Sequence, residues 1–357
     1  MMNQRLSRRE MIGRTTASLG ATAALRGQIA QAQSPSKASA SNRFPQVPSW
    51  NTELKKLAPN VYAYIQGGGP ASLNQGVSNA GLIVGEDHVM VIDSLGAPLH
   101  AKAFLAAIQQ TAPNKPIRRI LITHHHGDHI WGLPFFPRTE ILCHPYCRGT
   151  MLETPIPSPT WEKRAGWADG GEPRKIVAPT TTFTDSVTYY YAGMPVQLIF
   201  SGPAHTWGDV MVYLPEQKIL FAGDVAFHYV APFCHNGHAT KWIEQAGKVQ
   251  AMDVNVIVPG HGPIGGKKEI GEMAEYLAIF KREARKRYDA GLRPGQAAAE
   301  ITLGKYDNWI GARDRLVMNT VRLYHEFNGT LVPDADTEGM RVAGEEFNKL
   351  TAGRAKG

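Results

Sequence analysis

The sequence predicts an α/β fold, a four-layer αββα sandwich followed by a C-terminal helical extension. Short β-rich runs recur in both halves of the chain and are separated by segments of helical periodicity. Two further helical patterns follow the last β-rich run. With 357 residues, 43% of them hydrophobic, the chain is long enough to bury a core without disulfide bonds.

The N-terminus has the features of an export segment. Arg8 and Arg9 precede a weakly apolar stretch, and Ala30-Gln31-Ala32 offers a small-residue cleavage site. This pattern resembles a Tat signal peptide over residues 1–32, which implies the Tat machinery as a partner and a periplasmic or secreted protein. The alternative is a disordered basic leader. Arg26 interrupts the apolar stretch, so we expect no membrane anchor.

Residues 33–48 are rich in Ser, Ala and Pro and predict a flexible linker or surface arm. The formal charge of +7 arises largely before this linker, because five of the 38 basic and one of the 31 acidic residues lie in residues 1–32. The rest carries 33 basic against 30 acidic residues and contains no basic patch interleaved with aromatics. We therefore expect no nucleic-acid partner.

The first half of the predicted catalytic domain, residues 49–265, contains four strand candidates and one helix. The helix candidate runs from Pro98 to Thr111, with proline suited to its first turn. The strand candidates are Val61–Ile65, Ala80–Val84, His88–Asp93 and Arg118–Thr123.

The second half repeats this organisation. Its strand candidates are Val196–Phe200, Asp209–Leu214, Ile219–Ala222 and Val254–Val258, and a helix is expected over about 240–251. Helices over about 267–292 and 313–327 belong to the predicted extension and tail, residues 266–357. Two sheets with helices on their outer faces give the αββα arrangement.

A dense histidine cluster follows the fourth strand candidate. The segment His124-His125-His126-Gly127-Asp128-His129 places four potential metal ligands in six residues. Without a metal, such imidazoles would repel one another when protonated and compete for few hydrogen-bond partners. His125 lies between two of the candidate ligands and is expected to point away.

Three more candidate ligands follow apolar runs, each with glycine close by. They are His205 after Gly202-Pro203-Ala204, Asp224 after Gly223, and His261 between Gly260 and Gly262. Glycine next to a ligand leaves room for a metal and a substrate at a sheet edge.

The ordered series His124-x-His126-x-Asp128-His129, His205, Asp224 and His261 resembles the five-motif pattern of the metallo-β-lactamase superfamily. The resemblance covers about residues 61–262, and the prediction of an αββα sandwich rests on it more than on periodicity. It also implies two metals, Zn²⁺ or alternatively iron or manganese. It assigns His124, His126 and His205 to the first metal and Asp128, His129 and His261 to the second, with Asp224 bridging.

This resemblance implies a hydrolase that attacks its substrate with water activated by zinc. Asp128 is a candidate proton acceptor. Aspartate at position 224, where some zinc β-lactamases use cysteine, favours the lactonase, thioesterase and glyoxalase II branches, and hence a small-molecule ester, lactone or thioester. Tyr229 is a candidate hydroxyl donor to the oxyanion, because lactonase-like relatives place a tyrosine in a similar loop.

Three alternatives remain open at this point: a mononuclear iron persulfide dioxygenase, a β-lactamase-like amide hydrolase, and a non-enzymatic periplasmic metal-binding protein. Aromatic residues near the ligands predict an apolar pocket, which the loop from Gly67 to Asn79 should also face. The insertion from Glu153 to Thr182 is a candidate lid or, equally, a surface or dimer-contact loop. The three cysteines predict buried apolar side chains, and the sequence makes no prediction of an oligomeric state.

Overall fold

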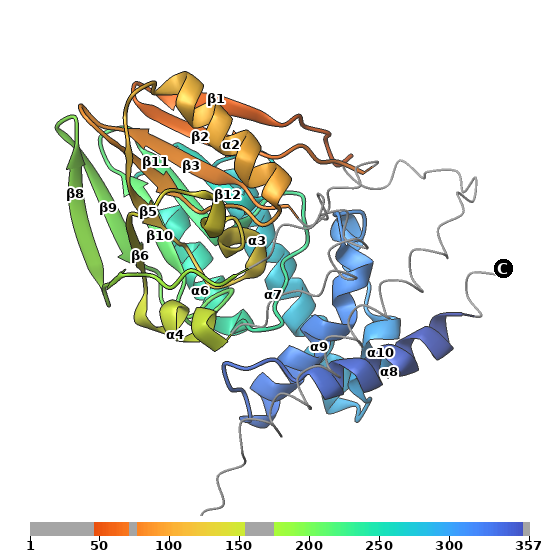
Figure 1. Cartoon of the computed structure of the whole chain (residues 1–357). Coiled ribbons are helices and arrows are strands. Elements are labelled where there is room, and N and C mark those ends of the chain that lie inside the picture. The colour runs from red at the N-terminus through yellow and green to blue at the C-terminus, as the bar shows by residue number, and fades with distance from the viewer. Residues whose placement is uncertain (1–45, 71–76, 154–174, 353–357) are drawn as a thin grey trace, which may run out of the picture.

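The computed structural model describes residues 46–70, 77–153 and 175–352, and it has the predicted αββα arrangement (Figure 1). The predicted export segment, most of the linker and most of the insertion after Glu153 lie outside the described residues.

The first sheet has seven strands that stand side by side in chain order. They are β1 (Glu53–Ala58), β2 (Val61–Ile65), β3 (Ala80–Val84), β4 (Val89–Ile92), β5 (Ile117–Leu121), β6 (Glu140–Cys143) and β7 (Thr181–Thr182). The pairs from β1 to β4 are antiparallel and those from β4 to β7 are parallel. A parallel pair needs a crossover, which α2 (Pro98–Thr111) supplies between β4 and β5. The short α4 (Pro145–Glu153) follows β6.

The second sheet has five strands in the order β12-β11-β10-β9-β8. These are β8 (Ser186–Tyr191), β9 (Met194–Phe200), β10 (Val210–Leu214), β11 (Ile219–Phe227) and β12 (Val256–His261). Only β11 and β12 pair in parallel, and α6 (Ala239–Ala251) connects them. The long helix α7 (Lys267–Asp289) follows β12 and packs beside α6.

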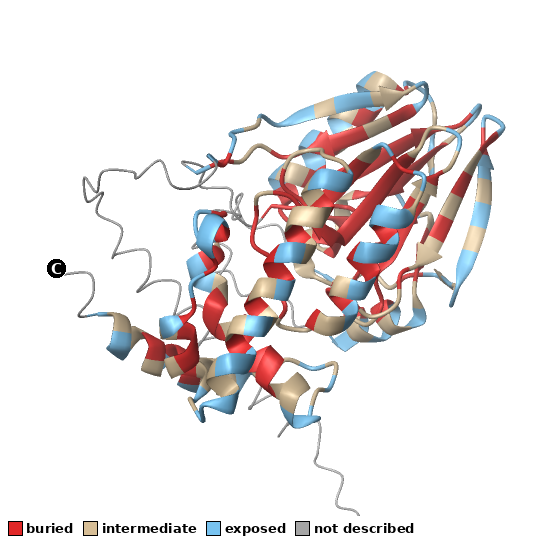
Figure 2. Cartoon of the chain, turned by 180° about the vertical axis from the view of Figure 1, so that it is seen from behind, coloured by how far each residue is buried: buried red, intermediate tan, exposed pale blue. Residues whose placement is uncertain are grey.

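Apolar side chains fill the space between the two sheets and the space under the helices on each outer face. Met90 and Leu121 of the first sheet belong to the same buried cluster as Val212 and Phe221 of the second. On the outer face of the first sheet, Phe104 of α2 packs on Tyr64 with ring centroids 4.8 Å apart. The strands are thus mostly buried, while the helices expose their outer faces (Figure 2).

The C-terminal extension forms a helical layer below the sandwich in the view of Figure 1, and α7 runs from the sandwich into this layer. It contains α8 (Pro294–Glu300), the short 3₁₀ helix η2 (Gly304–Tyr306), α9 (Ala312–Asn328) and α10 (Thr337–Thr351). The sequence analysis predicted α9 but not α10. The capping side chain of Asp336, which accepts from the Gly339 N–H at 2.8 Å, marks the start of α10.

Glu326 ties α9 to the start of α6. Its Oε2 accepts a hydrogen bond from the Thr240 hydroxyl at 2.5 Å, and its Oε1 lies 3.4 Å from Nδ1 of His238. Burial alone would raise the pKa of the Glu326 carboxyl, but the contacts with His238 and Thr240 outweigh this and hold the pKa below its ordinary value. The extension is therefore joined to the catalytic domain by a partly buried polar contact as well as by apolar packing.

Among the helices that the structure describes, none combines the length and apolarity needed to cross a membrane.

Candidate metal centre

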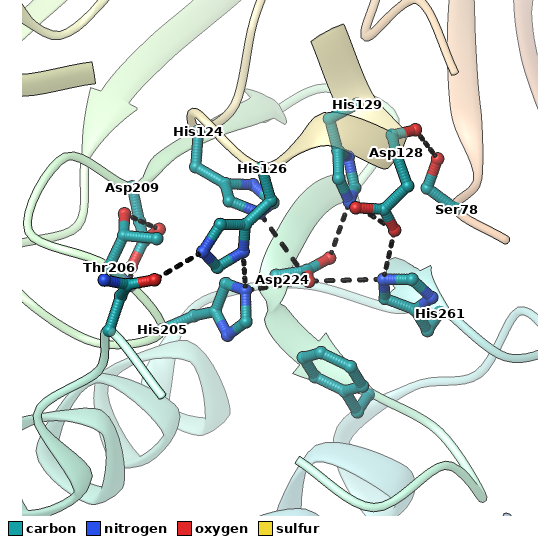
Figure 3. A network of polar contacts seen from close by, with 12 residues as sticks. Ser78, His124, His126, Asp128, His129, His205, Thr206, Asp209, Asp224 and His261 are labelled. Atoms are coloured by element: carbon teal, nitrogen blue, oxygen red, sulfur yellow. Dashed lines mark hydrogen bonds and ion pairs between the residues drawn. The ribbon is translucent and has the colours of Figure 1, made fainter. Parts of the chain in front are cut away.

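All seven predicted ligand residues lie together at one edge of the sandwich, where the two sheets meet (Figure 3). His124 and His126 stand in the loop after β5, Asp128 and His129 in the short helix α3 (Gly127–Ile130), His205 between β9 and β10, Asp224 within β11, and His261 at the end of β12. Both sheets therefore contribute to the cluster.

The donor atoms form two groups. One contains His124, His126, His205 and Asp224, and the other contains Asp128, His129 and His261; within each group the atoms lie within 4.8 Å of one another. The Asp224 carboxylate lies between the two groups (Figure 3). Its Oδ2 is 3.0 Å from Nε2 of His205 and 3.2 Å from Nε2 of His261, and its Oδ1 is 3.2 Å from Nε2 of His129.

Several of these atoms are buried without a hydrogen-bond partner. They are Nε2 of His124, Nε2 of His129 and Oδ1 of Asp224. Buried polar atoms in folded proteins are nearly always satisfied, and an ion is one explanation for an exception. The cluster combines imidazole nitrogens with carboxylate oxygens, which are donors that Zn²⁺ accepts. The residues therefore fit divalent metal ions.

The electrostatics of the centre also favour positive charge. Burial, together with the charge of His129, lowers the pKa of His124 well below its ordinary value and leaves a neutral imidazole with a free lone pair. Burial alone would raise the pKa of Asp224, but the surrounding histidines, His261 first, lower it well below the usual range. Conversely, burial would lower the pKa of His261, but the Asp224 and Asp128 carboxylates raise it to about 9. The carboxylates thus stabilise a cation at this position, either a proton or a metal.

Asp93 orients His129 from outside the cluster. Its Oδ2 accepts from Nδ1 of His129 and from the Thr123 hydroxyl, each at 2.8 Å, and its Oδ1 accepts from the Thr123 N–H at 2.8 Å. With Nδ1–H donated to Asp93, His129 turns Nε2 toward Asp224. This role has no signal in the sequence beyond a carboxylate at the end of the strand candidate His88–Asp93.

The end of the loop from Gly67 to Asn79 contacts the cluster, as predicted, although residues 71–76 lie outside the described part. Nδ1 of His261 donates to the Val77 carbonyl at 3.0 Å, which leaves Nε2 facing Asp128 and Asp224. The Ser78 hydroxyl donates to the backbone carbonyl of Asp128. The Asn79 amide also donates to the backbone on both sides of His261.

Two glycines flanking His261 allow β12 to approach the site closely. A Cβ added at Gly260 would collide with the Asp224 carboxylate. Gly262 has a φ of +100°, and a Cβ there would collide with the backbone of His228. The predicted role of these glycines as space for the centre is consistent with this packing.

The placement of Asp224 differs from the sequence analysis, which put it just after its strand. β11 instead continues to Phe227, and its register against β12 shifts at Gly223, whose φ is +51°. A local irregularity of this kind turns the strand and directs the side chain that follows it.

The structure does not bring Tyr229 into contact with the cluster through any interaction between described residues. Its ring packs on Trp309 with centroids 6.4 Å apart. Burial, followed by the charge of Glu269 on α7, raises the pKa of its phenol. Among the described residues, Phe227 and Trp242 do contact the proposed ligands. The Phe227 ring stacks on His261 with centroids 4.9 Å apart, and the Trp242 ring lies edge-on to His205 at 5.1 Å.

Two further residues adjoin His126 and were missed by the sequence analysis. The His235 ring stacks on the His126 ring with centroids 4.7 Å apart, and Oδ1 of Asn236 lies 3.2 Å from Nε2 of His126. Both come from the loop between β11 and α6, more than 100 residues along the chain, so no local spacing pattern connects them to the ligand. His125 belongs to neither donor group and packs edge-on against Tyr146 at 6.0 Å.

Comparison with known proteins agrees with this arrangement. A family model described as the metallo-beta-lactamase superfamily matches residues 73–261. A linear primary-alkylsulfatase from Pseudomonas sp. (strain ATCC 19151) is 24% identical over 262 residues, which cover 62% of this chain and 49% of that protein. A metallo-beta-lactamase type 2 from Bacteroides fragilis is 23% identical over 222 residues, covering 61% of this chain and 82% of that one. The chain thus spans about half the length of the alkylsulfatase.

A solved structure with a similar fold is the stereoselective inverting sec-alkylsulfatase Pisa1 from Pseudomonas sp., with a TM-score of 0.62 and 17% identity. The match covers 78% of this chain and 51% of that one. Because 78% of 357 residues is more than the 261 residues up to the end of β12, the similarity of fold extends at least into α7.

Proposed function

The chain belongs to the metallo-β-lactamase superfamily, and we propose that it is a hydrolase with two metal ions that cleaves an ester, lactone or thioester bond of a small molecule. The observation that carries the proposal is the pair of donor groups that meet at Asp224, whose carboxylate oxygens lie 3.0 to 3.2 Å from histidines of both groups. One carboxylate between two sets of donors is the arrangement expected of a bridging ligand.

In this proposal the first metal takes His124, His126 and His205, the second takes Asp128, His129 and His261, and Asp224 bridges. Zinc suits this mixture of imidazoles and carboxylates, with iron or manganese as alternatives. When bound, such ions lower the pKa of water to about 7 and polarise the bond to be cleaved.

The chain's own residues orient the donors and handle the proton. Asp93 and the Val77 carbonyl fix His129 and His261 so that their Nε2 atoms face the centre. Asp128 is the proposed proton acceptor at its carboxylate. Burial alone would raise the pKa of Asp128, but the charges of His129 and His261 lower it, so the carboxylate is ionised at neutral pH. Its side chain is 19% exposed, more than the side chains of His129, Asp224 or His261, and so can be reached from solvent.

A second candidate function is hydrolysis of a sulfate ester, since the relatives named above include alkylsulfatases. A positive charge near the centre favours it. The guanidinium of Arg315 lies over the rings of Phe227 and Phe233, 5.8 and 5.6 Å from their centroids. Phe227 in turn stacks on His261, so this charge is one ring away from a proposed ligand.

The test combines metal analysis with substrates that share a leaving group. Purified protein is assayed with 4-nitrophenyl acetate and 4-nitrophenyl sulfate, and then with a lactone, a thioester and a β-lactam. We expect about two metal ions per chain and faster turnover of the carboxylic esters than of the sulfate. Faster turnover of the sulfate would favour the second candidate.

The same measurements separate the remaining alternatives. A single iron with no hydrolysis but oxygen consumption on a persulfide would indicate the dioxygenase, and preference for the β-lactam would indicate an amide hydrolase. Stoichiometric metal with no activity on any of these compounds would favour a metal-binding protein.

A further inference from the structure

Asn236 meets the outer nitrogen of a proposed metal ligand. Nδ1 of His126 faces the centre, 2.7 Å from Nε2 of His205, while Nε2 of His126 lies 3.2 Å from Oδ1 of Asn236. If Asn236 accepts a hydrogen bond, the proton of a neutral His126 is held on Nε2. The lone pair is then on Nδ1, on the side of the proposed metal.

The orientation of the Asn236 amide follows from its second contact. Its Nδ2 donates to the backbone carbonyl of Pro333 at 3.2 Å. A carbonyl can only accept, so nitrogen must face Pro333 and oxygen must face His126. Pro333 lies between α9 and α10, and the amide is thus fixed by the C-terminal extension.

Two side chains of α9 hold the backbone of the same loop. Arg322 donates from Nε to the Gly237 carbonyl at 2.6 Å and from Nη2 to the Asn236 carbonyl at 3.2 Å. Asn319 accepts from the Cys234 N–H and donates to the Pro232 carbonyl, each at 2.9 Å. Residues three apart share a face of a helix, so Asn319 and Arg322 present one polar surface to the loop.

The burial of Arg322 makes this contact unusual. The residue is 1% exposed, and its Nη1 donates to a third backbone carbonyl, that of Asp334, at 2.9 Å. Burying a guanidinium is costly unless its donors are satisfied, and here the partners are backbone carbonyls of the loop and of the α9–α10 connection. Arg322 therefore joins the loop of Asn236 to the segment that holds the Asn236 amide.

We propose that the C-terminal extension is a working part of the metal centre: Arg322 and the Pro333 carbonyl position Asn236, and Asn236 holds His126 with Nδ1 directed at the metal. Asn236 and Arg322 are positioning residues, because they act through His126. The inference rests on the proposed function in so far as His126 is a metal ligand.

The test uses the full-length chain and two variants at each position. Asn236→Leu removes the acceptor at similar size, whereas Asn236→Asp keeps the acceptor and loses only the donor to the Pro333 carbonyl. Arg322→Met removes the three hydrogen bonds without leaving a buried charge, and Arg322→Lys keeps the charge and part of the bonding. Arg313→Met is the matched control, because Arg313 is an exposed arginine of the same helix that packs on Phe347.

Metal affinity is measured by competition with a chelator, using Zn²⁺ and Co²⁺. Asn236→Leu and Arg322→Met are each expected to lower the affinity for one of the two metals by about 10- to 100-fold. This is the usual loss of affinity when a residue that supports a ligand is removed. The absorption spectrum of bound Co²⁺ should also differ from that of the wild type in these two variants. Asn236→Asp and Arg322→Lys should each bind the metal more tightly than Asn236→Leu and Arg322→Met do, and Arg313→Met should bind it as the wild type does.

A second readout does not depend on metal. The ¹⁵N chemical shifts of His126 in the metal-free protein report which ring nitrogen carries the proton, and we expect Nε2–H in the wild type and a mixture in Asn236→Leu. Wild-type affinity and unchanged ¹⁵N shifts in Asn236→Leu would overturn the inference, even if His126→Ala lost a metal as the proposed function requires. If the wild type bound no metal, the proposed function would fail, while the ¹⁵N shifts would still decide whether Asn236 positions His126.

Discussion

Replacing Asp93 by asparagine should weaken metal binding although Asp93 touches no metal in the proposed assignment. The Thr123 N–H must still be accepted, so the amide oxygen takes the place of Oδ1 and the amide NH₂ takes the place of Oδ2. That NH₂ group then faces Nδ1–H of His129, and two donors cannot bond to each other. His129 is expected to move its proton to Nε2, the atom that lies 3.2 Å from Asp224.

The size of the effect follows from the bonds affected. Losing the support of one metal-ligating histidine costs about 10- to 100-fold in metal affinity, or roughly 1.4 to 2.7 kcal/mol. This agrees with the roughly 1.5 to 3 kcal/mol of a single hydrogen bond to a charged group. The expected result is therefore loss of one metal at chelator concentrations at which the wild type keeps two.

Asp209→Asn is the matched control for this experiment. Asp209 is also a buried carboxylate near the cluster, but its hydrogen bonds go to the backbone N–H and hydroxyl of Thr206 and to none of the seven proposed ligands. The metal affinity of the Asp209→Asn variant should stay within about threefold of the wild type, whereas Asp93→Asn is expected to lose at least about 10-fold in affinity. Equal weakening in both variants, or two tightly bound metals in Asp93→Asn, would refute the reasoning.

The remaining predictions concern catalysis, packing, export and pH. Asp224→Ala should lose metal and lower hydrolysis by several orders of magnitude, because both donor groups use this carboxylate; a fully active variant with one metal would contradict the shared role. Tyr229→Phe should leave kcat nearly unchanged because ring packing on Trp309 survives, whereas a fall of roughly 10²-fold with little change in KM would identify the hydroxyl as an oxyanion donor. Replacing Arg8 and Arg9 by lysine should cause precursor to accumulate, and mass spectrometry of exported wild type should find an N-terminus near residue 33; an intact Met1 there would argue against the signal peptide. Glu326→Gln should lower the free energy of unfolding by about 1.5 kcal/mol at pH 7. Since the native pKa of Glu326 is lowered, this difference should decline as the pH falls below the ordinary value of 4.5 and be lost once the pH is below the native pKa; a difference independent of pH would show that the charge is not involved.

Most of the sandwich could be predicted because its elements carry their pattern locally. The bounds of β2, β3 and α2 match the expected segments to the residue. β8 was missed although Ser186–Tyr191 is rich in β-branched and aromatic residues; as an edge strand it has only one buried residue, so no apolar run stands out. α10 was also missed; of its residues only Ala343, Gly344 and Phe347 are buried.

The proposed ligands could be found from the sequence because each stands in a short motif next to a strand. Their supports could not, because hydrogen bonds between distant segments leave no local pattern. Asp93 reaches His129 across 36 residues and Asn236 reaches His126 across 110. The Tyr229 hypothesis rests on the resemblance to lactonase-like relatives and stays a prediction. In the structure the ring packs on Trp309, and the backbone at Tyr229 has a positive φ of +59°.

The division of the donors between two sheets has a consequence for folding. His124 follows β5 of the first sheet, whereas Asp224 and His261 belong to the last two strands of the second, so neither sheet alone assembles either complete set of proposed ligands. On this assignment the first metal can be captured only after the chain is complete to Asp224, and the second only after it is complete to His261, in each case once the sheets have docked. Capture is therefore a late step. A ligand that binds only the native state stabilises it by about 2.7 kcal/mol at a concentration 100 times its Kd. With metal in excess, the metal-loaded fraction of a preparation would therefore report the fraction of molecules in which the two sheets have docked. Metal supplied during refolding should raise the yield of native protein, because bound metal stabilises the native state.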